Sequence, residues 1–278
     1  MSVDTLDLPL VIEPDMLADV LGHPNLLILD LSQPQSYTQG HVPGAVFLPF
    51  QQLMAGGKPA PGLLPSAEKL TALFSALGLT DQTHVVAYDD EGGGWAGRLI
   101  WTLDMIGHTQ YSYLDGGIHA WVAENKPLQT ETVEPVPSEY AATVVGDMSV
   151  NKAYILANLA NPKMVIWDAR SMEEHIGTKV NAIKGGHIPG AKSYEWTRAM
   201  DKANHLRIRD HKELLDELGS LGIVESKTVV THCQSHHRSG FTYLLGKVLG
   251  FPDIKAYPGS WGEWGNAAET PVKTELNQ

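Results

Sequence analysis

The chain has 278 residues, of which 43% are hydrophobic and 19% are charged, which excludes a disordered polymer and suits two globular domains. The net charge of −12 opposes nonspecific attraction to nucleic acid or anionic lipid, and no apolar run has the length of a membrane span. The single cysteine excludes an internal disulfide, and the first residues lack a secretory pattern. We therefore expect a cytoplasmic monomer without nucleic-acid or membrane partners.

The first half of the chain alternates apolar, β-rich runs with segments of helical period. Residues 26–31 (LLILDL) and 84–88 (HVVAY) are predicted strands. Between them, residues 66–78 (SAEKLTALFSALG) have apolar residues at three- and four-residue steps, which predicts an amphipathic helix. Ser66 is its expected N-cap and Gly78 its expected end.

The second half follows the same order. Residues 164–169 (MVIWDA) and 228–233 (TVVTHC) are predicted strands, and the capping-box spacing of Asp210 and Glu213 predicts a helix that begins ahead of Leu214. Such alternation is typical of an α/β fold with a buried parallel sheet flanked by helices.

The two halves also have matching residues at corresponding positions. Asp30 matches Asp168, and His41 in HVPGA matches His187 in HIPGA. A repeat of this length indicates one domain duplicated, because solenoid units recur every 20 to 50 residues or so. Since both histidines recur next to a proline and a glycine, we interpret them as structural turn residues.

The repeat predicts three parts of the chain. Residues 1–126 form a noncatalytic domain, residues 127–144 a linker, and residues 145–278 a catalytic domain. The linker prediction depends on its proline, threonine and glutamate content and its lack of apolar periodicity.

The single cysteine lies between a predicted strand end and a predicted helix start. Cys233 is followed by a polar run, namely Gln234, Ser235, His236, His237, Arg238 and Ser239. A helix N-terminus offers unpaired backbone N–H groups, and a nearby arginine or histidine can lower the pKa of a thiol further. This context favours a reactive thiolate over a buried structural cysteine. In the first half, Asp89 begins the corresponding loop, so only the second half can perform thiol chemistry.

These segments resemble the tandem-domain rhodaneses over nearly the whole chain. The resemblance rests on HIPGA, the loop CQSHHRS, the later GSWGEW and the acidic residue in the first-half loop. The loop is similar to that of a bacterial subtype with cysteine, glutamine, serine or threonine, two histidines and arginine. The resemblance implies two rhodanese-like domains. It also implies transfer of the outer sulfur of thiosulfate to cyanide or a small thiol, by a ping-pong mechanism through a cysteine persulfide. It implies no dissociable cofactor.

The resemblance also assigns roles to residues. Cys233 would be the nucleophile, and Arg238 the main cation for the sulfonate of the donor. Arg170 and Trp196 lie on segments that the family brings near the site, whereas Glu174 stands where many members have a further arginine. The expected substrate-binding residues are Gln234, Ser235, His236, His237, Arg238, Ser239, Arg170 and Trp196.

Four other interpretations stay open from the sequence. A 3-mercaptopyruvate sulfurtransferase and a persulfide carrier for a biosynthetic protein partner share the same thiol chemistry. A phosphatase is disfavoured because four residues, not five, separate Cys233 from Arg238. A metal site using His232, Cys233, His236 and His237 is disfavoured because His232 and Cys233 are neighbours at a strand end, where successive side chains point to opposite faces. We therefore expect no metal.

Overall fold

The computed structural model describes residues 6–275. Its contacts divide the chain into two compact units. The N-terminal unit contains residues 6–53, 65–145 and 201–208, and the C-terminal unit contains residues 54–64, 146–200 and 209–275. By their contacts, residues 54–64 group with the C-terminal unit and residues 201–208 with the N-terminal unit. The domain bounds expected from the sequence stay a prediction.

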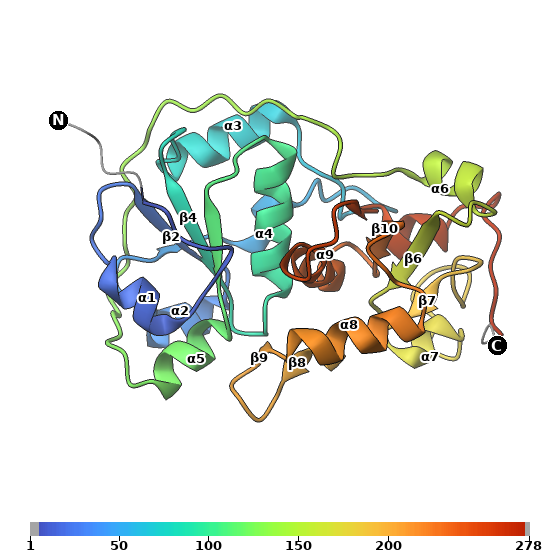
Figure 1. Ribbon diagram of the computed structural model, residues 1–278. Coiled ribbons are helices and arrows are strands. Elements are labelled where there is room, and N and C mark those ends of the chain that lie inside the picture. The colour runs from blue at the N-terminus through green and yellow to red at the C-terminus, as the bar shows by residue number, and fades with distance from the viewer. Residues whose placement is uncertain (1–5, 276–278) are drawn as a thin grey trace. The chain divides into compact units, whose positions relative to one another are not determined.

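The N-terminal unit is built on a five-stranded sheet whose ladders are all parallel, in the order β1-β5-β4-β2-β3. Its strands are β1 (Val11–Ile12), β2 (Leu26–Asp30), β3 (Val46–Phe47), β4 (His84–Tyr88) and β5 (Tyr111–Leu114). Its helices are α1 (Pro14–Asp19), α2 (Pro34–Gln39), the 3-10 helix η1 (Phe50–Leu53), α3 (Ala67–Ala76), α4 (Gly94–Met105) and α5 (Gly117–Ala123). Figure 1 shows α4 and α1 on opposite sides of this sheet.

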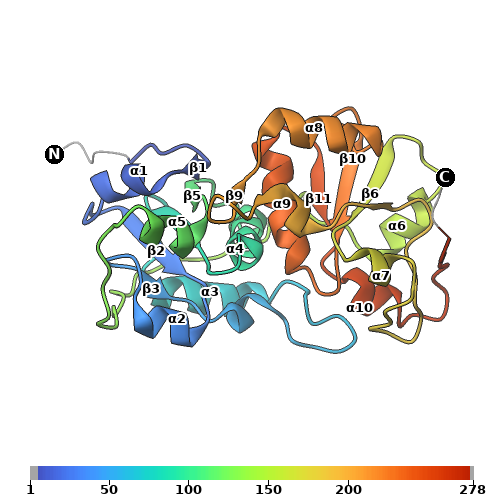
Figure 2. The same cartoon turned by 90° about the horizontal axis from the view of Figure 1, so that it is seen from below.

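The C-terminal unit repeats this plan on a four-stranded parallel sheet in the order β11-β10-β6-β7. Its strands are β6 (Met164–Asp168), β7 (Lys192–Ser193), β10 (Thr228–His232) and β11 (Ile254–Ala256). Its helices are α6 (Lys152–Asn158), α7 (Met172–His175), the 3-10 helix η2 (Trp196–Ala199), α8 (His211–Ser220), α9 (Arg238–Val248) and α10 (Ser260–Trp264). Figure 2 shows α9 and α6 on opposite sides of β10 and β6. Separately, β8 (Met200–Asp201) pairs with β9 (Arg207–Ile208).

The helix ends agree with the chemistry of their sequences. The side chain of Ser66 accepts a hydrogen bond from the backbone N–H of Lys69 and caps α3, and Gly78 follows the helix with φ +83°. Asp210 caps α8 by accepting from the N–H of Glu213 at 3.0 Å. The helices predicted for residues 66–78 and ahead of Leu214 are thus confirmed.

Equivalent strand registers place the two loops at equivalent sites. Asp30 lies opposite Tyr88 in the N-terminal sheet, and Asp168 lies opposite His232 in the C-terminal sheet. The next residue along is Asp89 in one unit and Cys233 in the other. Both therefore occupy the carboxyl end of a central parallel strand, the edge at which open α/β sheets bind ligands.

The repeated histidines are fully buried at the turns that follow α2 and α7. His41 Nδ1 lies 2.9 Å from the carbonyl oxygen of Tyr37, and His187 Nδ1 lies 2.8 Å from that of His175. Each imidazole stacks on the ring of the same partner, with centroids 3.8 Å apart. These contacts support a structural role in both units.

Over the part of the chain that the structure describes, no helix is both long and apolar enough to span a membrane.

Candidate active site

The loop that carries Cys233 is held by its backbone. The loop begins after His232, the last residue of β10. Its first residue, Cys233, is only 1% exposed. The carbonyl oxygen of Cys233 accepts from the N–H of Trp261 at 2.9 Å, and its N–H donates to the hydroxyl of Ser260 at 3.3 Å. Gln234 adds a third bond, since its carbonyl accepts from the N–H of Gly262 at 2.9 Å. The first turn of α10 thus fixes the start of the loop.

A segment from elsewhere in the sequence packs directly on this loop. A Cβ atom at Gly62 would lie 2.1 Å from the carbonyl oxygen of Ser235, and one at Gly262 would lie 2.8 Å from that of Pro59. Because no side chain fits at either contact, glycine is required there for the backbones to approach. Residues 59–62 therefore pack closely against the loop that carries Cys233.

The sulfur atom has a defined hydrogen-bond donor. Ser239 Oγ donates to Cys233 Sγ at 3.4 Å, and His236 Nδ1 lies 2.8 Å from the same hydroxyl. A hydroxyl has one proton, so the imidazole must donate to Ser239 when Ser239 donates to sulfur. His236 is fully buried and has φ +56°, a left-handed conformation that turns the loop back toward Ser239.

The surroundings of the thiol favour its ionised form. Burial alone would raise the pKa of Cys233, but the positive charge of Arg238, hydrogen bonds from Ser239 and the charge of His237 outweigh burial. The pKa of the thiol therefore lies below its ordinary value, which increases the thiolate fraction at neutral pH.

We expect Ser239→Ala to raise the pKa of Cys233 by about one pH unit, because a hydrogen bond to a charged group is worth roughly 1.5–3 kcal/mol. The measurement is the pH dependence of the alkylation rate by iodoacetamide. Ser235→Ala is the matched control, because the Ser235 side chain lies in the same loop and lines the neighbouring cavity, whereas the hydroxyl of Ser239 donates to the sulfur. Identical pH profiles for the two variants would contradict the role of Ser239.

Arg238, the expected sulfonate-binding cation, is engaged by a carboxylate. Its Nη1 donates to Glu174 Oε2 at 2.6 Å and its Nη2 to Glu174 Oε1 at 3.0 Å. Burial would raise the pKa of Glu174, but its hydrogen bonds from Arg238 and the charge of that guanidinium lower it to about 2. Arg238 is thus a charged side chain near Cys233 whose charge is compensated.

Arg170 is buried on the loop that follows β6. Its guanidinium donates to both oxygens of Asp168, at 2.8 and 2.6 Å, and to the carbonyl of Gly186 at 2.8 Å. It also lies over the ring of Trp261, 4.3 Å from the centroid. The structure thus places Arg170 in a buried ion pair beneath the loop, and a contact of Arg170 with substrate stays a prediction.

Trp196, at the start of η2, lies beside the other side of the loop. Its ring makes edge contacts with His237, at 5.5 Å between centroids, and with Phe241 of α9, at 6.2 Å. The structure therefore brings Trp196 and His237 together, and a contact of either residue with substrate stays a prediction.

The N-terminal unit shows what this loop geometry can hold. The carboxylate of Asp89 is 1% exposed and accepts four backbone N–H bonds. Their donors are Glu91 at 3.1 Å, Gly93 at 2.8 Å, Trp95 at 3.0 Å and Ala96 at 3.0 Å. Burial and the charge of Glu91 nevertheless raise the pKa of Asp89 to about 6. The loop and the first turn of α4 thus form a cradle for a negatively charged group.

The same positions surround Cys233 in the C-terminal unit. In both units four residues separate the strand-end residue from the first residue of the helix, Gly94 in one and Arg238 in the other. By this correspondence, the four N–H groups that hold Asp89 match those of Ser235, His237, Ser239 and Gly240. A carboxylate extends about one atom beyond the position of Sγ, which is where a second sulfur atom would lie.

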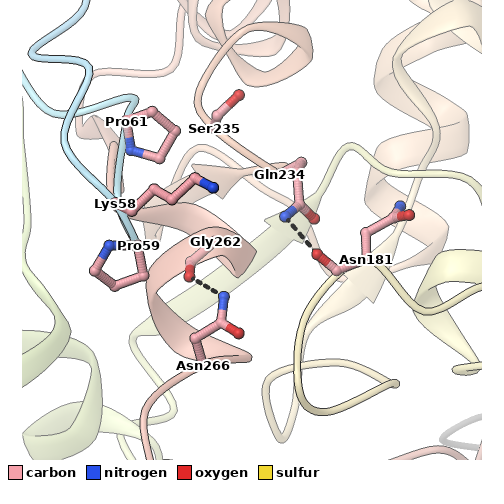
Figure 3. A pocket seen from close by; sticks show the side chains of 8 residues that line it. All are labelled: Lys58, Pro59, Pro61, Asn181, Gln234, Ser235, Gly262 and Asn266. Carbon is pink, nitrogen blue, oxygen red and sulfur yellow. Dashed lines mark hydrogen bonds between the residues drawn. The ribbon is translucent and has the colours of Figure 1, made fainter.

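A cavity of about 630 Å³ adjoins the loop that carries Cys233 (Figure 3). It is lined by Lys58, Pro59, Pro61, Asn181, Gln234, Ser235, Gly262 and Asn266. Figure 3 shows the amino group of Lys58 pointing into this cavity, and Gln234 Nε2 donates to the carbonyl of Asn181 at 3.2 Å. Sequence reasoning missed Lys58, because its segment lies far from the cysteine loop in the chain.

Among residues 6–275, no group of three or more histidine, cysteine, aspartate and glutamate side chains is arranged to hold a metal ion. His232, one of the ligands considered from sequence, is fully buried with its Nε2 3.7 Å from Asp168 Oδ1. Burial lowers the pKa of His232 to about 4, so it is neutral at physiological pH.

Comparison with known proteins agrees with this geometry. The rhodanese-like domain matches the chain twice, at residues 13–124 and 151–267. A thiosulfate sulfurtransferase of Pseudomonas aeruginosa is 50% identical over 267 residues, covering 96% of this chain and 98% of the relative, and one of Azotobacter vinelandii is 49% identical over 270 residues, covering 97% and 99%. A sulfur carrier protein of Thermus thermophilus is 30% identical over 278 residues, covering 94% and 95%. The chain, with its two matched domains, therefore belongs to the rhodanese family.

Proposed function

We propose that this protein is a thiosulfate sulfurtransferase that carries the transferred sulfur atom as a persulfide on Cys233. The observation that carries the proposal is the position of this thiol in a loop whose counterpart, at Asp89, holds an anion with four backbone N–H groups. The relatives at 50% and 49% identity over nearly the whole chain support thiosulfate as the donor.

In the first half-reaction the Cys233 thiolate attacks the outer sulfur of thiosulfate. A sulfur–sulfur bond forms to the enzyme, the sulfur–sulfur bond of the donor breaks, and its electron pair leaves with sulfite. The negative charge of the new persulfide then lies near the backbone N–H groups of Ser239 and Gly240, in the first turn of α9. Such N–H groups stabilise an anion without any change of protonation.

In the second half-reaction a nucleophile attacks the outer sulfur. Cyanide yields thiocyanate and regenerates the Cys233 thiolate, and a small thiol yields its own persulfide. Since the chain has one cysteine, no second thiol within it can resolve the persulfide, and the acceptor must come from outside. Ping-pong kinetics follow from this order of steps. Neither half-reaction needs a dissociable cofactor.

Two cations lie within reach of an anionic donor near the loop. Arg238 can present its planar guanidinium to a sulfonate, although Glu174 holds it in the resting structure. Lys58 lines the cavity that Gln234 and Ser235 also line, and it can attract anions toward the loop. Both are proposed contributors to donor binding.

A persulfide carrier for a protein acceptor is the second candidate function. The 30% identical relative from Thermus thermophilus is named as a sulfur carrier, and the burial of Cys233 would protect a persulfide from solvent. The two functions differ in their kinetics. An enzyme turns over rapidly with cyanide, whereas a carrier retains its persulfide until a protein partner removes it.

Intact-mass measurement tests the proposal. Treatment with thiosulfate is expected to add about 32 Da, one sulfur atom, and subsequent cyanide to remove it with release of one equivalent of thiocyanate. Sulfate is the matched control, because it has the charge and shape of thiosulfate but no transferable sulfur. No mass gain with thiosulfate would refute the proposal, and a gain that cyanide does not remove would favour the carrier.

A further inference from the structure

The ion pair between Arg238 and Glu174 compensates the charge of a cation that acts on the Cys233 thiol. Both terminal nitrogens of the guanidinium donate to the carboxylate, at 2.6 and 3.0 Å, which is the two-point geometry that arginine favours with carboxylates. The Glu174 residue is only 2% exposed, so water screens the pair weakly. Glu174 therefore compensates the positive charge of Arg238 that a dianionic donor would approach.

Glu174 is itself held in place by its own unit. Its N–H and its carboxylate complete a capping box with Ser171 at the start of α7. Asn181 Nδ2 donates to Glu174 Oε1 at 3.0 Å, and the backbone N–H of Ser171 donates to Oε2 at 3.3 Å. Both carboxylate oxygens thus have a partner besides Arg238, so the carboxylate stays oriented when the guanidinium turns toward a ligand.

We propose that Glu174 is a positioning residue that tunes the charge of the donor site, holding Arg238 beside Cys233 while weakening its attraction for dianions. The proposal rests on the function proposed above. When thiosulfate binds, Arg238 shares its N–H donors between the sulfonate and Glu174. When sulfite leaves, the N–H donors of Arg238 bind Glu174 alone again. The carboxylate thereby lowers affinity for the dianionic donor and, to the same extent, for the dianionic product that must depart.

The direct test compares donors of different charge in Glu174→Gln. The amide keeps the length of the side chain and an oxygen for Arg238, but it removes the negative charge. We expect the KM for thiosulfate, a dianion, to fall by roughly five- to tenfold, because the variant removes the repulsion between the carboxylate and both negative charges of the ligand. The KM for methanethiosulfonate, a monoanion, should fall by less than about threefold.

The same helix offers a matched control. Glu173 precedes Glu174 in α7 and is exposed, so Glu173→Gln makes the same change of net charge without touching Arg238. It should leave both KM values unchanged. Glu174→Asp, which restores the charge, should return the ratio of the two KM values toward that of the wild type. Glu174→Met, which also removes the charge, replaces Glu174→Gln if that variant fails to fold.

The outcomes separate this proposal from the function on which it rests. If both KM values rise together in Glu174→Gln, the carboxylate only supports the packing of Arg238 and the proposal is wrong. An unchanged ratio of KM values would overturn it too. Failure of wild-type Cys233 to gain sulfur from thiosulfate would instead refute the sulfurtransferase function, and it would do so before any Glu174 variant is measured.

Discussion

Cys233→Ser is expected to reduce thiocyanate formation by about 10⁴-fold or more, since removal of a covalent nucleophile usually abolishes its reaction pathway. The hydroxyl of serine stays protonated in this site and is a poor nucleophile toward sulfur. The measurement is the steady-state rate of thiocyanate release from thiosulfate and cyanide, read alongside the intact mass. The variant should show no gain of sulfur.

The substitution is close to isosteric, so loss of activity should not reflect loss of structure. The fixed backbone contacts of residue 233, its carbonyl bond to Trp261 and its N–H bond to Ser260, do not involve the sulfur. The thermal midpoint should therefore stay within a few degrees of the wild type. Residual activity above about 1% would mean that a group other than Cys233 carries sulfur. That group would not be a thiol, since the chain has no second cysteine.

The sequence predicted well those features that depend on local chemistry. The N-cap at Ser66, the cap at Asp210 and the position of Cys233 between a strand and a helix each follow from residues close together in the chain. The α/β class and the duplication were predictable because hydrophobic periodicity and repeated segments survive in both halves. The helix predicted after Cys233 begins at Arg238.

The charge of the active site was harder to predict. Glu174 and Arg238 are 64 residues apart, and only the packing of α7 near the start of α9 joins them. The resemblance to the rhodaneses implies that Glu174 stands where many members have an arginine, but it did not show that the carboxylate would bind Arg238.

Two other residues show the same limit. Lys58 lies in a segment between two elements of the first half, and nothing in its local sequence ties it to the cavity beside Gln234. Arg170 was assigned to the substrate from its segment alone, whereas the structure shows its guanidinium bound by Asp168, two residues earlier. Periodicity shows which face of an element is buried, but it does not give the partner of a buried charge.

That buried pair predicts the largest loss of stability. Asp168→Asn should lower the free energy of unfolding by about 3–5 kcal/mol, because it leaves the guanidinium of Arg170 buried without its counterion. Asp168 is fully buried and Arg170 is 1% exposed. Burial would raise the pKa of Asp168, but Arg170, His232 and His175 hold it well below its usual value. Its contribution should therefore be present above about pH 4 and be lost as pH falls through the depressed pKa.

The duplication supplies a matched control for this prediction. Asp30 occupies the equivalent strand end, but its carboxylate accepts from the Tyr88 hydroxyl at 2.5 Å and the Ser32 N–H at 2.7 Å, with no arginine two residues on. Asp30→Asn should therefore cost only about 1–2 kcal/mol. The comparison is made by urea unfolding of each variant and of Asp168→Asn combined with Arg170→Leu. The double variant should recover part of the lost stability, because it removes the uncompensated charge; strictly additive losses would show that the pair is not what stabilises the fold beneath the cysteine loop.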